Sequence, residues 1–242
     1  MNILFLIYSL IVPVNGFFFN PSLTLSSGRK ITVKGKGYPV VFSPGLFGTM
    51  PSFLYSNFLQ ELQKNLTMVT INDMKPVTKR DIDNIAEKLN VDQISYLSHS
   101  SFFPEVLESS RINQAILMDP INIPKIKMTG LENYQFDLSI PTYILKSEKL
   151  YQTATPLPAW QDPTFKGNVE EETILDVGHP DILDDLWSNI ANDLGMWDTL
   201  SPNRTQFKNW KFEKKSNEIS SLRQEYRKSL AKKVIKFINV QA

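Results

Sequence analysis

Three residues whose side chains could together hydrolyse an ester each closely follow a short apolar segment of the chain. They are Ser100, Asp119 and His179. A serine hydroxyl is too weakly acidic to attack an ester unaided, so an imidazole must take its proton, and a carboxylate must hold that imidazole in the correct tautomer. The three residues are therefore candidates for nucleophile, acid and base.

The choice of base and acid follows from how few candidates there are. The chain has two histidines. His99 is adjacent to Ser100, so we expect its side chain to point away from the serine, which makes His179 the base. Two acids are candidates: Asp119, and Glu148, which follows a later apolar segment. We favour Asp119 and keep Glu148 as the alternative acid.

A hydrolase of this kind also needs backbone N–H groups that bind the oxyanion. The loop at residues 43–48 (SPGLFG) follows the first long apolar segment of the chain. We expect Leu46 or Phe47 to donate one N–H and Ser101, after the nucleophile, to donate the other. The alternative interpretation of Gly45 and Gly48 is a tight turn that any fold could need.

The composition excludes several other kinds of function. The chain has 242 residues, 42% of them hydrophobic, which suffices for one domain with a core. It has no cysteine, so disulfides and thiolate nucleophiles are excluded. The two histidines rule out a three-histidine metal site, and a net charge of +1 gives no reason to expect nucleic-acid binding. We expect neither a metal nor a cofactor.

The elements that must position these residues form an α/β pattern. Short apolar segments alternate with amphipathic ones, which predicts a mostly parallel sheet with helices on both faces. Ligands of such sheets bind at the carboxyl ends of the strands, where the three candidates lie. The expected strands are residues 38–42, 68–71, 93–97, 114–118, 142–145 and 173–177; the expected helices are 53–66, 79–89 and 217–238; residues 153–165 are expected to be a loop that covers one end of the sheet.

The N-terminal part differs from the rest, because no acidic residue precedes Glu61. Residues 3–14 are an apolar segment of the length of a signal-peptide core, which predicts a signal peptide at 1–16. Residues 17–37 are basic and rich in hydroxyl groups, as in a transit peptide or a disordered leader, so we place the domain at 38–242. The alternatives are a signal anchor or buried strand at residues 3–14, and a secreted or endomembrane location for the protein. Asn65 and Asn203 lie in glycosylation tripeptides.

The segment at residues 178–185 (GHPDILDD) is similar to the histidine loop of chlorophyllases, G-H-x-D-x-L-D-D, within the α/β hydrolases. Asp119-Pro120 resembles the pair that carries the acid in chlorophyllases and in their platelet-activating-factor-hydrolase-like relatives. The resemblance implies the α/β-hydrolase fold and cleavage of the phytyl ester of chlorophyll without metal or cofactor. A domain at 38–242 is short for that family, which predicts a small or absent lid. Peripheral association with membranes is an expectation for so lipophilic a substrate. Phe17 stands where the two-part leaders of algae with secondary plastids carry a phenylalanine, which predicts a plastid location.

The resemblance has departures at the nucleophile. The segment around the family's serine reads G-H-S-x-G-G, whereas here Ser98 and the pair Phe102-Phe103 replace its glycines, and Pro44 replaces a histidine of the oxyanion loop. Those glycines relieve crowding around a strained serine. The alternative hypothesis is therefore a catalytically degenerate α/β hydrolase that binds pigment or lipid.

Overall fold

The computed structural model describes residues 22–45, 48–100, 104–122, 140–149, 155–156, 168–193 and 212–241. Several predictions fall outside these residues. They are the signal peptide at 1–16, the oxyanion candidates Leu46, Phe47 and Ser101, the pair Phe102-Phe103, Asn203, and most of the loop at 153–165.

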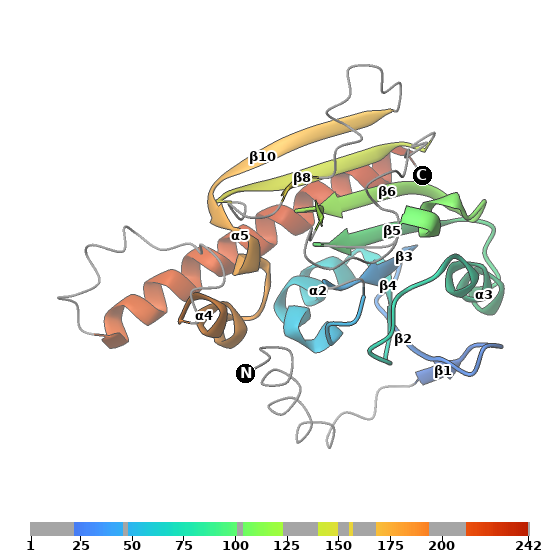
Figure 1. The fold of residues 1–242 in the computed structure, drawn as a ribbon, viewed down its shortest axis with the longest axis horizontal. Coiled ribbons are helices and arrows are strands. Elements are labelled where there is room, and N and C mark those ends of the chain that lie inside the picture. Colours follow the sequence, from blue (N-terminus) through green and yellow to red (C-terminus); the bar gives the residue numbers. More distant parts are fainter. Residues whose placement is uncertain are drawn as a thin grey trace.

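An eight-stranded sheet forms the centre of the molecule, in the order β1-β2-β4-β3-β5-β6-β8-β10 (Figure 1). Strands β1 and β2 are antiparallel to their neighbours, and all other pairs are parallel. The strands are β1 (Ser22–Thr24), β2 (Lys30–Lys34), β3 (Tyr38–Ser43), β4 (Leu66–Ile71), β5 (Ile94–His99), β6 (Ile112–Met118), β8 (Thr142–Lys149) and β10 (Val169–Gly178); β7 (Ile121–Asn122) and β9 (Thr155–Pro156) form a separate pair. The predicted mostly parallel sheet is confirmed.

Helices cover both faces of this sheet, as predicted. Successive side chains of a strand point to opposite faces. Val40 and Phe42 of β3 pack in one core cluster with α2 (Ser56–Gln63) and α5 (Phe212–Gln241), while Val41 packs in the other cluster with α3 (Lys79–Leu89). In the described ranges, the other helical elements are η2 (Ser52–Tyr55), η3 (Pro104–Glu108), η6 (His179–Ile182) and α4 (Asp185–Asp193). No helix in the described part of the chain has the length and apolarity to cross a membrane.

The sheet begins before residue 38, which corrects the predicted domain boundary. Strand β2 pairs along its length with β4, and Ile31 on it is fully buried opposite Ile71. The predicted leader at 17–37 thus contains two strands of the sheet. The composition of this segment predicted a leader because β2 carries only two apolar residues, Ile31 and Val33, between basic and hydroxyl residues.

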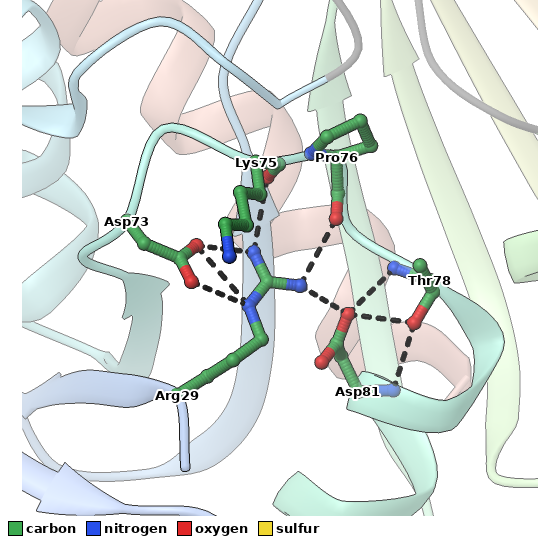
Figure 2. A network of polar contacts seen from close by, with 6 residues as sticks. All are labelled: Arg29, Asp73, Lys75, Pro76, Thr78 and Asp81. Carbon is green, nitrogen blue, oxygen red and sulfur yellow. Dashed lines mark hydrogen bonds and ion pairs between the residues drawn. The ribbon is translucent and has the colours of Figure 1, made fainter. Parts of the chain in front are cut away.

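An arginine anchors this N-terminal part to the rest of the domain (Figure 2). The Arg29 guanidinium donates to the carboxylates of Asp73 and Asp81 and to the backbone carbonyls of Lys75 and Pro76, both at 3.0 Å. Asp81 is almost fully buried and caps α3, where its carboxylate accepts hydrogen bonds from the Thr78 N–H and hydroxyl. Arg29 therefore neutralises a buried carboxylate that already holds the start of a helix.

Replacing Arg29 with methionine should lower the free energy of unfolding by about 3 kcal/mol, because Asp81 would remain buried without its cation. Urea unfolding followed by tryptophan fluorescence measures the change. Lys36→Met is the matched control, since Lys36 is exposed and its loss should change stability by less than about 0.5 kcal/mol. Equal stability of the two variants would show that the Arg29 contacts contribute little.

Candidate active site

Ser100 lies immediately after β5, at the carboxyl end of the sheet. It is buried, with 4% of its surface exposed, and its φ of 65° is in the left-handed region. Its N–H donates to the carbonyl of Met118 on the neighbouring strand at 2.9 Å. A non-glycine residue held in this conformation costs roughly 1–3 kcal/mol, which the surrounding structure must offset. This is the strained strand-end backbone that presents the serine in α/β nucleophile turns.

Asp119 and His179 are in direct contact at the same end of the sheet. Asp119 follows β6 and is 3% exposed, and its Oδ2 lies 3.2 Å from Nδ1 of His179, the first residue of η6. An ionised carboxylate only accepts hydrogen bonds, so Nδ1 of His179 carries the hydrogen. In the neutral ring Nε2 is then the basic nitrogen, as a general base requires.

The carboxylate of Asp119 is held by Ser147 of β8 as well as by His179. The Ser147 N–H donates to Oδ1 at 2.5 Å and its hydroxyl donates to Oδ2 at 2.6 Å. Burial would raise the pKa of Asp119, but the hydrogen bond from His179, the two nearby imidazoles and the Ser147 hydroxyl together hold that pKa below its usual value. The acid therefore stays ionised beside the ring that it orients. Ser147 had no signal in the sequence.

Glu148, the alternative acid, lies elsewhere. Its side chain is exposed, and its carboxylate accepts a hydrogen bond from the N–H of Asp176 at 2.7 Å. Neighbouring residues of a strand point to opposite faces, so Ser147 faces Asp119 while Glu148 faces solvent. Of the two candidate acids, Asp119 is the one in contact with His179.

His99 belongs to the site, which the sequence reasoning missed. Its ring stacks on the ring of His179, with centroids 4.4 Å apart and planes 23° from parallel. Its Nδ1 lies 2.9 Å from the hydroxyl of Tyr55, and its Nε2 lies 3.1 Å from the backbone carbonyl of His179. Burial, followed by the charge of His179, lowers the pKa of His99 to about 3. His99 is therefore a neutral ring within the site.

Part of the predicted oxyanion loop also reaches the site. A Cβ placed on Gly45 would lie 3.4 Å from the Cβ of Ser100 and 3.1 Å from the Tyr55 hydroxyl, so the bare backbone of Gly45 approaches the serine closely. Gly48 has a φ of 86° and its N–H donates to the carbonyl of Pro44. Gly48 thus fits the tight-turn interpretation, while Gly45 is set beside Ser100.

Side chains of α5 anchor the loop that carries His179. Asp181 is fully buried; one oxygen accepts from the Gly178 N–H at 2.8 Å, and the other accepts from Nε of the buried Arg223 at 2.9 Å. Arg227 donates to the carbonyl of Leu183 and to Asp185. Asp181 and Asp185, which lie in the first turns of η6 and α4, therefore each pair with an arginine of α5.

His99, Asp119 and His179 have side chains of the types that bind metal ions. Donor atoms of His99, Asp119 and His179 lie within 4.8 Å of one another, the one such group found in the described residues. Each side chain has partners within the protein: His99 has Tyr55 and the His179 carbonyl, and Asp119 has Ser147 and His179. Hydrogen bonding within the chain accounts for the arrangement of the three side chains.

The chain was compared with protein families, with curated sequences and with solved structures. No family model matches the chain, and no curated protein matches its sequence. A solved α/β hydrolase from a sediment metagenome of the Mar Chica lagoon, Morocco, matches with TM-score 0.52 and 12% identity, over 74% of this chain and 97% of its own. The naproxen esterase of Bacillus subtilis matches with TM-score 0.50 and 13% identity, over 79% of this chain and 95% of its own. The carboxylesterase CesB of the same organism matches with TM-score 0.50 and 10% identity, over the same shares. The chain has the α/β-hydrolase fold.

Proposed function

We propose that the protein is a serine hydrolase of carboxylic esters. The observation that carries the proposal is the buried Ser100 in a left-handed backbone conformation at the end of β5. Asp119 follows the neighbouring strand β6, and its carboxylate contacts His179. The candidate nucleophile and acid follow the neighbouring strands β5 and β6, and the candidate base follows β10 at the same edge of the sheet. Two of the solved structures with the same fold are carboxylesterases by name, which agrees with this reaction class.

In this reaction the Ser100 hydroxyl attacks the ester carbonyl while Nε2 of His179 takes its proton. The tetrahedral oxyanion is bound by backbone N–H groups of Ser101 and of Leu46 or Phe47. The C–O bond to the alcohol then breaks, and His179 returns the proton to the leaving alcohol. His179 then takes a proton from water as the water oxygen attacks the acyl carbon; the bond to the Ser100 oxygen breaks, the carboxylic acid leaves, and His179 returns the proton to Ser100. Throughout, Asp119 keeps the hydrogen of His179 on Nδ1.

For the substrate we propose a lipophilic ester of the chlorophyll phytyl type. The proposal rests on the similarity of residues 178–185 to the chlorophyllase histidine loop and on Asp119-Pro120. Peripheral contact with a membrane would bring the protein to such a substrate. We also propose delivery to a plastid. Since β1 starts at Ser22 and belongs to the sheet, a removed leader would have to end before that residue.

Ser100 should react covalently with a fluorophosphonate probe, because an activated serine attacks phosphorus as it attacks an ester carbonyl. In-gel fluorescence measures the labelling. Ser100→Ala should abolish it, whereas Ser110→Ala, which changes an exposed serine, should not. The rival function is pigment or lipid binding without catalysis, favoured by the loss of the family glycines at Ser98 and Phe102. Absence of labelling in folded wild-type protein would support that rival and sink the enzyme.

The ester class is tested by incubating the purified protein with chlorophyll and, separately, with short p-nitrophenyl esters. We expect release of phytol and chlorophyllide, measured by chromatography, with the Ser100→Ala variant inactive. Hydrolysis of the short esters alone would keep the reaction class and remove chlorophyll as the substrate.

A further inference from the structure

A directed chain of hydrogen bonds runs from Gly45 to His179 through Tyr55 and His99. A backbone carbonyl only accepts, so Nε2 of His99, 3.1 Å from the His179 carbonyl, must carry the hydrogen. In the neutral ring Nδ1 is then an acceptor, so the Tyr55 hydroxyl donates to it at 2.9 Å. The Tyr55 oxygen in turn accepts from the Gly45 N–H at 3.0 Å. All three hydrogen bonds therefore have their donors on the side of Gly45 and their acceptors on the side of His179.

We propose that His99 is a positioning residue for the ester hydrolysis proposed above: its neutral, Nε2-protonated ring ties the backbone of His179 to the loop at Gly45, across Ser100. The inference rests on the proposed function for its catalytic meaning. The hydrogen-bond chain itself is a property of the fold and can be measured separately.

This link joins two loops that no strand pairing joins. Gly45 follows β3 and His179 follows β10, and strands β5, β6 and β8 lie between those two in the sheet. His99 is the residue before Ser100, so the link passes through the segment that carries the nucleophile. The two side chains of this link, Tyr55 and His99, are buried, and so is His179, which contributes its backbone carbonyl. One ring therefore connects the backbone of the base to the loop at Gly45, in addition to the contacts that Asp119 and Arg223 make around His179.

The same ring must remain uncharged while His179 takes up a proton. Among the residues that the structure describes, the titratable side chains that act on His99 are Tyr55, His179 and Asp119. Burial and the neighbouring His179 lower the pKa of His99 to about 3, against the opposing effect of Asp119. A neutral ring stacked at 4.4 Å avoids a like charge beside the imidazolium that forms on His179 during turnover.

Histidine ¹⁵N NMR tests the tautomer directly, because the chain has two histidines and His99→Gln assigns them. We expect His99 to be the Nε2–H tautomer with no titration between about pH 5 and 8, where free imidazole changes charge. An Nδ1–H tautomer, or titration near the ordinary histidine pKa, overturns the proposal. This measurement does not depend on any substrate.

Variants test the consequence for catalysis. Glutamine at position 99 offers one acceptor and one donor, as the neutral imidazole does, whereas leucine offers neither. His99→Leu should lower kcat about a hundredfold with little change in KM, since a small misplacement of reacting groups has effects of that size, and His99→Gln should recover about tenfold of that loss. A role in packing alone predicts the reverse order, with the apolar leucine better tolerated in a buried position.

Tyr55→Phe keeps the ring of residue 55, which packs edge-on against Phe42, and removes only its hydroxyl. We expect kcat to fall about tenfold and the His99 tautomers to become mixed. Tyr143→Phe is the matched control, because it removes a tyrosine hydroxyl that donates to Glu172 on β10. If wild-type protein labels at Ser100 while all these variants match it in kcat, the positioning role fails and the enzyme stands. If wild-type protein does not label, the function fails, and the NMR tautomer still supports or overturns the hydrogen-bond chain.

Discussion

Replacing Asp119 with asparagine should reduce ester turnover by about four orders of magnitude while the protein stays folded. The asparagine oxygen can still accept from the Ser147 N–H, which leaves its NH₂ group facing Nδ1 of His179. A donor at that place favours the tautomer with the hydrogen on Nε2, and such a ring cannot take a proton from Ser100. The lost hydrogen bond to the Ser147 hydroxyl should lower stability by about 1 kcal/mol. Steady-state turnover and thermal unfolding on the same sample separate the two effects.

Glu148→Gln is the control for this experiment. Glu148 is exposed and contacts the backbone of Asp176, so we expect turnover within about twofold of the wild type. Near-full activity in Asp119→Asn would remove Asp119 from the triad. If the Asp119→Asn variant is less stable but turns over ester as fast as the wild type, Asp119 serves only to hold the loop at Pro120. A large loss in Glu148→Gln would transfer the role of acid to that residue.

Acidification from about pH 6.5 to about pH 4 should lower the free energy of unfolding by about 3 kcal/mol through His99 alone. The pKa of its ring is about 3 in the folded protein, where burial is the main cause, and 6.5 in the unfolded chain. Between those values the unfolded chain binds one more proton than the folded protein. Stability is therefore fully present above pH 6.5 and is lost as the pH falls, with no further loss from His99 below about pH 3.

Urea unfolding at a series of pH values measures this dependence. The lowered pKa values of Glu172 and Asp119 act in the same direction as the pH falls towards their unfolded values of 4.5 and 3.8, so the contribution of His99 is read from a comparison with a variant that lacks its ring. His99→Gln is the control, because glutamine does not titrate, and its stability should depend on pH less steeply by about one proton. Equal slopes in the two proteins would mean that His99 is not held neutral in the folded state.

The local sequence pattern was sufficient to predict the parallel strands of the sheet and the edge at which the candidate residues lie. Strand β6 ends in four consecutive apolar residues, and β5 has apolar residues at three of its six positions, which was enough to predict both strands. Residues that follow parallel strands meet at one edge of the sheet. That reasoning predicted a site that includes Asp119 and His179, which are in contact although 60 residues separate them in the sequence. It needed only the period of the elements and the direction of the strands.

The tertiary structure alone decided which distant side chains meet. Strand β2 has too few apolar residues to be recognised, and it belongs to the sheet because Ile31 packs opposite Ile71 and Arg29 reaches Asp73 and Asp81. The contact of His99 with Tyr55 depends on how η2 packs against the end of β5. Ser147, and not Glu148, contacts Asp119 because of which side of β8 faces that residue. A sequence pattern records the period of one segment, whereas these contacts depend on the packing of several segments at once.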